Sequence, residues 1–349
     1  MLNVRNFSRA AALLVGFALL TGADYLGRVK LEKSQNFMGT SFQITVFESD
    51  LSQENLARTV DDAFKLIGDL DAKLSSFKET SVIAHINQAK AGEVFKLDDD
   101  TLYVLNTALS AWQMSGGAFD VTVWPLKKLW LQAKEKSEPP TDNAVKATLT
   151  HVGYSAVMLD PITKNLTLKK QGVQIDLGGI GKGYALDKVS TFLIEHGVRS
   201  AIINGGGNLK FVGASQEGTN WRVGIEHPRK IEEYAAVMEL PESVSVSTSG
   251  DYEDFFLYKG KRYSHIFDPH TGVQPDNHIV SVTVVAKNAT LADALSTAFF
   301  VMGPEKGFPM IESLKEEKVE AVCIEEGADG KLNLSASEGI QPYLKDILL

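Results

Sequence analysis

The stretch VQIDLGGIGKGYALDKV, residues 173–189, places a glycine-rich turn between a short predicted strand and a predicted helix. Its glycines are Gly178, Gly179, Gly181 and Gly183. Such a turn presents backbone N–H groups at the start of the helix, where a phosphate or pyrophosphate binds well. It is not a P-loop, because Lys182 is followed by glycine and not by Ser or Thr. A tight turn that needs glycines for positive φ is the alternative, but their density favours a ligand.

Outward from this turn, the residue patterns alternate between helix and strand. A stripe of apolar residues at helical spacing predicts an amphipathic helix over residues 52–75, with Asp50 and Gln53 as a capping box. A second helix is expected over residues 100–115, ended by a glycine pair. Residues 133–144 are charged and contain prolines, which predicts an exposed loop.

Short strand patterns dominate from residue 156 onward, interrupted by helical patterns at residues 184–196, 291–302 and 305–314. Strands in runs with helices set apart predict an α+β fold and not a regular βαβ winding. At roughly 150 residues per domain, the length of 349 residues suggests two lobes.

The composition narrows the function classes. The chain has 44 acidic and 35 basic residues, a net charge of −9, which argues against bulk binding of nucleic acid. Its single cysteine, Cys323, excludes an intramolecular disulfide and a zinc site built from several thiolates. A hydrophobic content of 44% is typical of a globular protein with a large core. These features indicate an acidic protein that handles small molecules.

Residues 1–23 have the pattern of a secretory signal peptide. Arg5 and Arg9 precede the apolar run AAALLVGFALL, and small residues follow it. The run is shorter than the roughly 20 residues of a membrane span, so an uncleaved anchor that tethers the protein to the inner membrane is the less favoured alternative. Asp24 occupies the position at which a lipoprotein carries cysteine. We expect export to a bacterial periplasm, without a lipid anchor, of a mature domain covering residues 30–345.

A second glycine cluster, INGGGNLKFVG, occupies residues 203–213 after another predicted strand. Asn204 and Asn208 could donate hydrogen bonds to a ligand. A glycine-rich hairpin or bulge explains the cluster equally well, so both interpretations stay open.

Residues 248–272 contain His265 and, three residues later, Asp268 in a polar turn. A histidine in such a position can act as a general base whose tautomer the acid fixes. A structural histidine is the commoner alternative, and the spacing of His265 and His270 does not suggest a metal pair.

The segment ATLADALSTAFFVMG, residues 289–303, begins another predicted helix. Thr290 and Asp293 have the spacing of a capping pair, which is the interpretation that spacing alone favours. Asp293 and Thr297 also share one helical face, and a carboxylate with a hydroxyl suits Mg²⁺.

Three segments nearer the N-terminus mix aromatic or apolar residues with a few polar ones: residues 36–42, 75–88 and 115–130. Each is compatible with ordinary core and turns. Each is equally compatible with the wall of a pocket for a flat aromatic ligand.

Together these segments resemble one family. From Met38 to about Gly307 the chain is similar to the ApbE family, the FAD:protein FMN transferases, whose fold is a two-lobed, T-fold-related α+β domain. The two glycine clusters and ADALSTA are the most specific of the matching stretches. Those stretches, in family order, are MGT (38–40), SSFKETSVIAHIN (75–87), GGAFDVTVWPL (116–126), DLGGIGKGYALD (176–187), NGGGNLKFVG (204–213), WRVGIEHP (221–228), TSGDYEDFF (248–256), RYSHIFDPHTG (262–272) and VTVVAKNATLADALSTAFFVMG (282–303).

The resemblance implies a Mg²⁺-dependent enzyme that transfers the FMN half of FAD to a Ser or Thr hydroxyl of an exported acceptor protein and releases AMP. Acceptors of this kind include subunits of membrane redox pumps. By position, the residues implied to contact FAD are Met38, Phe77, Ala118, Phe119, Asp120, Asp176 and Lys182. Asp293, Thr297 and a backbone carbonyl of Gly179 would hold the metal, and His265 would be the catalytic base. At Asp293 the resemblance thus favours a metal ligand over a cap.

The chain departs from the family pattern at two of these stretches. Phe77 stands where members often have Tyr, and Gly181 where Ala is common. Two other functions stay open: an FAD pyrophosphatase with water as acceptor, and a periplasmic flavin-binding protein without turnover. The joint presence of Asp293, Thr297 and His265 speaks against the second of these, since a binding protein needs no base.

Overall fold

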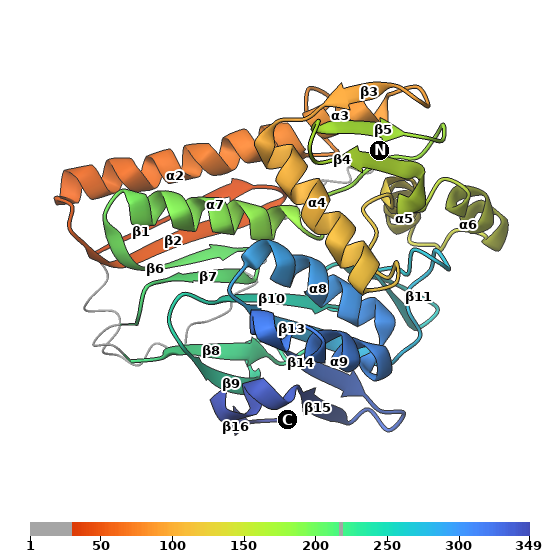
Figure 1. The fold of residues 1–349 in the computed structure, drawn as a ribbon. Coiled ribbons are helices and arrows are strands. Elements are labelled where there is room, and N and C mark those ends of the chain that lie inside the picture. Colours follow the sequence, from red (N-terminus) through yellow and green to blue (C-terminus); the bar gives the residue numbers. More distant parts are fainter. Residues whose placement is uncertain (1–29, 216–218) are drawn as a thin grey trace, which may run out of the picture.

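The computed structural model describes residues 30–215 and 219–349 (Figure 1). The predicted signal peptide, residues 1–23, lies outside these residues. No helix in the described part of the chain is both long enough and apolar enough to cross a membrane. Helices and antiparallel strands are mixed along the chain, which confirms the α+β class.

An eight-stranded antiparallel sheet forms the centre of the molecule, in the order β1-β2-β6-β7-β10-β13-β14-β15. Every residue of β13 is buried, so both faces of the sheet are covered at this strand. The strands are β1 (Leu31–Phe37), β2 (Thr40–Ser49), β6 (Val198–Gly205), β7 (Asn208–Val212), β10 (Ser245–Gly250), β13 (Ile279–Ala286), β14 (Glu320–Glu326) and β15 (Leu332–Ala336).

Helices cover one face of this sheet. Figure 1 shows α2 and α7 along the strands β1, β2 and β6, and α8 and α9 along β10, β13 and β14. A further helix, α4, packs on α8. The helices of this layer are α2 (Gln53–Leu74), α4 (Asp99–Met114), α7 (Gly181–Glu195), α8 (Ala289–Met302) and α9 (Pro304–Glu312).

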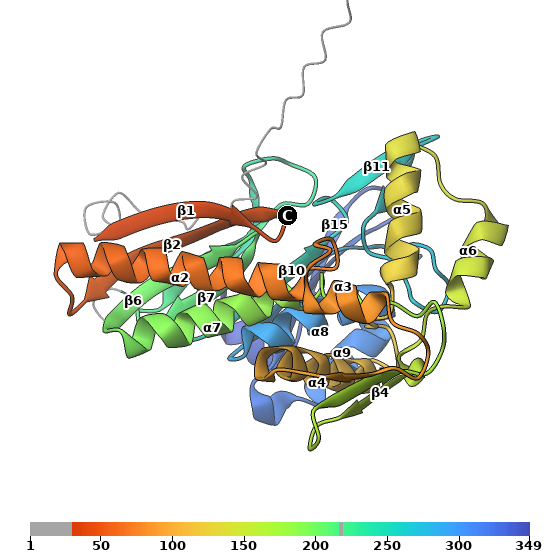
Figure 2. The ribbon, with the colours of Figure 1, turned by 90° about the horizontal axis from the view of Figure 1, so that it is seen from above.

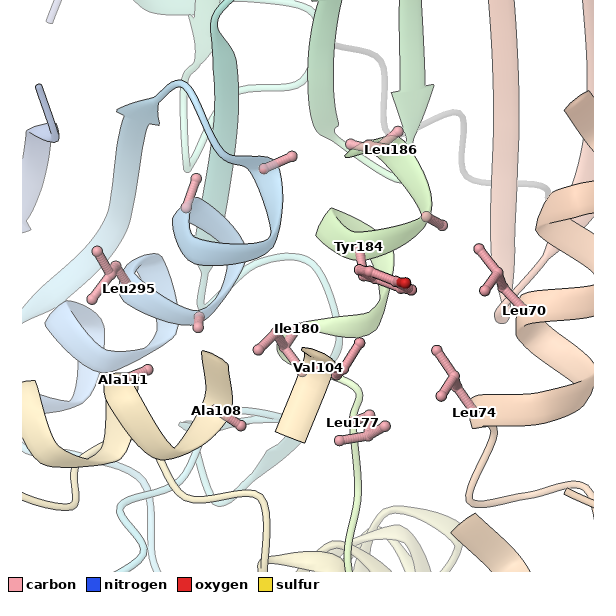
Figure 3. Packing of buried hydrophobic residues seen from close by; sticks show 14 of the residues in the cluster. Leu70, Leu74, Val104, Ala108, Ala111, Leu177, Ile180, Tyr184, Leu186 and Leu295 are labelled. Carbon is pink, nitrogen blue, oxygen red and sulfur yellow. The ribbon is translucent and has the colours of Figure 1, made fainter. Parts of the chain in front are cut away.

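The apolar core of the helical layer fixes the start of α7. Figure 3 shows Leu74 of α2, Ala108 of α4 and Leu295 of α8 around Leu177 and Ile180, which directly precede α7. Ile180 is fully buried. Because these side chains come from three other helices, the glycine-rich turn is held in place by tertiary packing.

A small sheet covers the opposite face of the central sheet. It consists of β16 (Leu344–Ile347), β9 (Tyr234–Leu240) and β8 (Trp221–Glu226). Trp221 is buried and stacks on Phe211 of the central sheet, with ring centres 5.0 Å apart. The central sheet is therefore the middle of three layers.

The remaining elements gather at one end of the molecule, where Figure 2 shows α5, α6 and β11. Trp130 of α5 stacks on Tyr263 of β12, with ring centres 5.7 Å apart, so α5 supports the hairpin that leads into His265. These elements are α3 (Val82–Asn87), α5 (Trp124–Lys136), α6 (Asp142–Leu149), the sheet of β3 (Val94–Lys96), β5 (Asn165–Leu168) and β4 (Val157–Asp160), and the hairpin of β11 (Phe255–Tyr258) and β12 (Lys261–Ser264).

The predicted helices are all present, with ends that move by a few residues, but two local predictions are wrong. The cap of α2 is Ser52, whose hydroxyl accepts from the Asn55 amide, and not Asp50. The predicted loop at residues 133–144 is mostly helical, since only residues 137–141 separate α5 from α6. The lysines in the last turn of α5 are favourable at a helix C-terminus. The loop prediction treated these lysines only as a sign of an exposed segment.

The predicted strand at residues 173–176 is also wrong. Only Gln174 makes a bridge, to Val123. The Asn87 side chain accepts from the Ile175 amide at 2.6 Å and donates to the Ile175 carbonyl at 2.8 Å. The segment thus has only a short parallel contact with residues 121–123, in which the Asp176 amide donates to the Val121 carbonyl at 2.7 Å, and the Asn87 side chain supplies the hydrogen bonds at Ile175.

Candidate active site

Two adjoining cavities contain all the residues that the family resemblance assigns to FAD, metal or catalysis. One, of about 180 Å³, is lined by Ala118, Phe119, Asp120, Gly179, His265, Asp293 and Thr297. The other, of about 480 Å³, is lined by Met38 and Phe77. Asp176 and Lys182 line both cavities, together with Lys127 and Gly178. The folded chain therefore brings the predicted site residues together from distant segments.

A larger cavity of about 710 Å³ beside α4 and α7 contains none of these residues. Lys188 and Lys210 in its wall pair with Asp100 and Asp187, at 3.1 and 3.2 Å. Because these charges already satisfy each other, we place the chemistry in the two smaller cavities.

Close approach of two helices explains one of the glycines in the turn. A Cβ atom on Gly183 would lie 2.2 Å from the carbonyl oxygen of Ala289 and 2.8 Å from Cβ of Asp293. The Gly183 amide donates to Oδ2 of Asp293 at 2.9 Å. None of the four glycines from Gly178 to Gly183 has a positive φ, so the structure does not support the interpretation as a turn that needs positive φ.

The second glycine cluster is a hairpin that positions Asp293. Gly206 and Gly207 have positive φ and join β6 to β7, while Asn204 Oδ1 accepts from the Gly207 amide at 3.1 Å. Asn208 Nδ2 donates to Oδ1 of Asp293 at 2.8 Å. The side chain of Asn204 therefore stabilises the hairpin, as the hairpin interpretation predicts. The side chain of Asn208 binds the carboxylate of Asp293 instead of being free to bind a ligand.

The capping prediction for Asp293 is wrong. The cap of α8 is Asn288, whose side chain accepts from the Leu291 amide at 2.7 Å. Asp187 accepts from the amide of Thr290 at 2.8 Å. These residues satisfy the start of α8, so the carboxylate of Asp293 is directed to Gly183 and Asn208 beside the cavity.

The donor atoms around Asp293 fit a magnesium ion. Thr297 Oγ1 lies 3.3 Å from Ser249 Oγ, and a Cβ atom on Gly179 would lie 3.4 Å from Thr297 Oγ1. A carboxylate and a hydroxyl are hard oxygen ligands of the kind that Mg²⁺ prefers. The described residues contain no cluster of three or more His, Cys, Asp or Glu side chains. A metal at this wall would therefore rest on one carboxylate and complete its shell with water and substrate oxygens.

Asp176 connects the two cavities through a fixed set of contacts. Its carboxylate accepts from Ser76 Oγ at 2.5 Å, from Lys127 Nζ at 2.8 Å and from the Gly178 amide at 3.1 Å. Burial alone would raise the pKa of Asp176, but the charge of Lys127 and these hydrogen bonds hold that pKa below its ordinary value. Asp176 is therefore an ionised anchor for Lys127.

An exposed aromatic ring forms part of the larger cavity. Phe77 is 61% exposed, and its ring meets Trp124 edge to face with centres 4.7 Å apart. Met38 lies in the same wall, at the turn between β1 and β2. An aromatic side chain that remains this exposed beside a cavity offers a surface on which a flat ring can stack.

The predicted residues at positions 118–120 form the inner wall of the smaller cavity. Phe119 is buried, and a Cβ atom on Gly179 would lie 3.1 Å from its ring. Asp120 is also buried, and its carboxylate accepts from the amides of Thr122 at 2.7 Å and Tyr154 at 2.8 Å. These bonds show that Asp120 holds the wall together, in addition to lining the cavity.

His265 is exposed at the cavity, but its predicted partner is wrong. Asp268 accepts from the amide and from Nδ1 of His270, at 2.8 and 3.0 Å. His265 Nδ1 instead lies 3.3 Å from the Asp254 carbonyl oxygen. A carbonyl only accepts, so Nδ1 carries the hydrogen and Nε2 is left to accept a proton.

The surroundings favour the neutral form of the His265 ring. Desolvation lowers its pKa below the ordinary value, Asp254 opposes this, and the positive charges of Lys182 and Lys127 lower it further. Because the ring remains exposed, solvent moderates the effect without reversing its direction. The imidazole is therefore available as a base at neutral pH.

The sequence analysis assigned no role to several polar residues of the site, among them Lys127 and Glu253. Lys127 lies in both cavities, and Glu253 lines the smaller one with His265. Burial raises the pKa of Glu253 to about 8, with the negative charge of Asp293 acting in the same direction. Lys127 lies in the segment 115–130 and Glu253 in the matching stretch TSGDYEDFF, but neither segment marked these side chains as site residues, because their surroundings are set by segments far apart in sequence.

Comparison with known proteins identifies the family of the chain. The model of the ApbE family matches residues 38–323. The FAD:protein FMN transferase of Vibrio cholerae serotype O1 is 30% identical over 345 residues, which cover 98% of this chain and 99% of the relative. That of Treponema pallidum is 32% identical over 302 residues, which cover 81% of this chain and 83% of the relative.

Solved structures give the same result. Flavin transferase ApbE from Vibrio cholerae matches with a TM-score of 0.78 and 28% identity, over 90% of this chain and 98% of that one. The ApbE protein of Thermotoga maritima matches with a TM-score of 0.80 and 30% identity, over 90% of this chain and 99% of that one. The chain belongs to the ApbE family.

Proposed function

We propose that this chain transfers the FMN half of FAD to a Ser or Thr hydroxyl of an acceptor protein, with Mg²⁺ as the metal and AMP as the second product. The observation that carries this proposal is that Asp293, Thr297 and His265 line one cavity. The cavity adjoins a second one with the exposed Phe77 ring. The names of the relatives, FAD:protein FMN transferase, support flavin transfer as the general activity.

The reaction replaces one phosphorus–oxygen bond by another. The acceptor hydroxyl oxygen bonds to the phosphorus of the FMN half, and the bond from that phosphorus to the bridging oxygen breaks, so that the bridging oxygen leaves with AMP. The hydroxyl is a weak nucleophile until its proton is removed, and Nε2 of His265 takes that proton. Asp293, Thr297 and the Gly179 carbonyl would hold Mg²⁺, which supplies neutralisation of the pyrophosphate charge.

The exposure of His265 favours a large acceptor. A base that takes a proton from a protein hydroxyl must be reachable from outside the cavity, and the His265 ring is exposed. Water reaches the same atom, so an FAD pyrophosphatase that forms FMN and AMP is the second candidate. A flavin-binding protein without turnover is the third candidate. It does not account for the orientation of the His265 ring, since a protein that only binds flavin needs no base.

Intact-mass analysis separates the three. The protein is incubated with FAD, Mg²⁺ and a candidate acceptor, such as an exported subunit of a membrane redox pump. A gain in acceptor mass equal to FMN, lost with EDTA or with His265→Ala, supports transfer. Release of AMP without a modified acceptor supports the pyrophosphatase, and FAD binding with neither product supports the binding protein.

We also propose that the protein acts in the periplasm after export. The support is the signal-peptide pattern of residues 1–23, with its basic start and short apolar run. Cell fractionation with N-terminal sequencing of the mature protein tests this. A new N-terminus near Asp24 in the periplasmic fraction is expected, whereas an intact N-terminus in the membrane fraction would indicate an uncleaved anchor.

A further inference from the structure

Lys127 lies where the two cavities of the candidate active site meet. It extends from α5 and lines both cavities, the one with Phe77 and the one with Asp293 and Thr297. Its side chain is 28% exposed. The ammonium group is therefore accessible from the cavities while most of the side chain is packed.

Several contacts fix this ammonium group. Its Nζ lies 2.8 Å from Oδ2 of Asp176, 5.3 Å from the centre of the Phe77 ring and 5.9 Å from that of Trp124. An ammonium has three N–H donors, and Asp176 is its one hydrogen-bond acceptor among the described residues. Donors therefore remain for a ligand, on a group that is already held in position.

We propose that Lys127 binds the FMN-side phosphate of FAD, an inference that rests on the proposed function. A flavin stacked on Phe77 continues through its ribityl chain to this phosphate, and the pyrophosphate then leads toward the wall of Asp293 and Thr297. Lys127 stands between these two walls. With Lys182, which also lines both cavities, it is thus a cation beside the phosphorus that the acceptor attacks.

In this position Lys127 would promote the reaction as well as bind the flavin phosphate. Negative charge on the oxygens of the attacked phosphoryl group must be stabilised, and a fixed ammonium does this without reorganisation. Asp176 keeps the ammonium oriented, since Ser76 and the Gly178 amide hold the same carboxylate. Asp176 is in this respect a positioning residue for Lys127.

The next residue in the chain provides a matched control. Lys128 is exposed and donates to Oε1 of Gln174 at 2.6 Å. It lies 6.0 Å from the centre of the Trp124 ring, much as Lys127 does, but lines neither cavity. Lys128→Gln therefore removes an equal charge from the same helix without touching the site.

The test compares three flavins: riboflavin, which has no phosphate, FMN, which has one, and FAD, in which a pyrophosphate joins the flavin half to adenosine. Their affinities are measured by flavin fluorescence titration, with EDTA and with Mg²⁺, for the wild type, Lys127→Gln, Lys127→Arg and Lys128→Gln, each checked for folding by circular dichroism. Lys127→Gln is expected to weaken binding of FMN and FAD by roughly tenfold or more and to leave riboflavin unchanged. Lys127→Arg keeps more of the FMN affinity than Lys127→Gln, and Lys128→Gln binds all three like the wild type.

Two results would overturn this inference alone. Lys127→Gln could bind FAD as tightly as the wild type, or it could lose riboflavin as strongly as FMN, which would mean that Lys127 only supports the Phe77 ring. If the wild type itself failed to bind FAD, the proposed function would fall and this inference with it. The wild-type titration therefore distinguishes the two failures.

Discussion

The amide nitrogen of Gly183 donates a 2.9 Å hydrogen bond to Oδ2 of Asp293, across 110 residues of sequence. The bond joins the first turn of α7 to the first turns of α8. It exists because Gly183 has no Cβ, so the two helices can approach until backbone meets carboxylate. The first glycine cluster therefore shapes the candidate metal site through packing.

Gly183→Ala is expected to destabilise the protein and to abolish flavin transfer. The added Cβ would lie 2.2 Å from the Ala289 carbonyl oxygen, and backbone cannot move aside as a side chain can. Overpacking of this kind costs ~1–3 kcal/mol, and the shift of α8 displaces Asp293. Chemical denaturation and the intact-mass assay measure the two effects.

Gly181→Ala is the control for that variant. A Cβ there would have only Leu177 Cβ, at 4.0 Å, within contact distance, and the position lies in the same helix. Replacing a glycine in the middle of a helix by alanine stabilises by ~0.5–1 kcal/mol, and Gly181 is the first residue of α7, so Gly181→Ala should be at least as stable as the wild type. Equal effects of the two alanines would contradict the close approach at Gly183.

Asn208→Ala is expected to raise the Mg²⁺ concentration needed for half-maximal transfer. Asn208 Nδ2 orients Oδ1 of Asp293, and removing a residue that orients a metal ligand typically costs roughly 10–100-fold in metal affinity or activity. A Mg²⁺ titration of the transfer rate measures this. Asn106→Ala, at an exposed position of α4, should titrate like the wild type, and an unchanged Asn208→Ala curve would rule out the orienting role.

Transfer activity is expected to persist into mildly acidic solution. Desolvation, with Lys182 and Lys127, lowers the pKa of His265, so the base stays unprotonated through the neutral range and activity falls only below the ordinary histidine pKa of about 6.5. His265→Ala should reduce the rate by roughly 10²–10⁴-fold in the neutral range and should remove the acid limb of the pH–rate profile. The pH–rate profile at saturating FAD and Mg²⁺ provides the measurement.

Asp268→Asn should leave that profile in place. Its carboxylate binds His270 and not His265, while the Asp254 carbonyl faces His265. If Asp268→Asn shifted the acid limb of the pH–rate profile as much as a substitution of His265 does, Asp268 would interact with His265. The conclusion that the Asp254 carbonyl fixes the tautomer of His265 would then be wrong.

Glu253 should make the metal-free protein less stable as pH rises. Burial raises its pKa in the folded state to about 8 from an ordinary value of 4.5, so the folded state binds the extra proton between these values. Stability then falls as pH increases through this window. Glu253→Gln removes this titrating group. The melting temperature of the variant minus that of the wild type should therefore be larger at pH 8.5 than at pH 5. An equal difference at both pH values would contradict the raised pKa.

Local patterns in the sequence were enough for the helices, whereas the candidate site residues were carried over from the family resemblance. The apolar stripe of residues 52–75 needs only its own spacing to predict α2. Local predictions failed at Ser52, at residues 133–144 and at residues 173–176, and the predicted partner of His265 and the capping role of Asp293 were also wrong. In each, a competing interaction decided the outcome, such as the Asn87 side chain that supplies the hydrogen bonds at Ile175.

The sequence by itself determined the α+β class, the family and a set of residues that turned out to share one pair of cavities. Only the tertiary structure decided what those residues do to one another: that Asn208 and Gly183 orient Asp293, that the Asp254 carbonyl faces His265, and that Lys127 joins the two cavities. The physical reason is the separation along the chain over which each kind of interaction acts. Helix and turn preferences act over a few residues and can be read along the chain, whereas hydrogen bonds and charge effects at a site depend on distances between segments far apart in sequence, which exist only after packing.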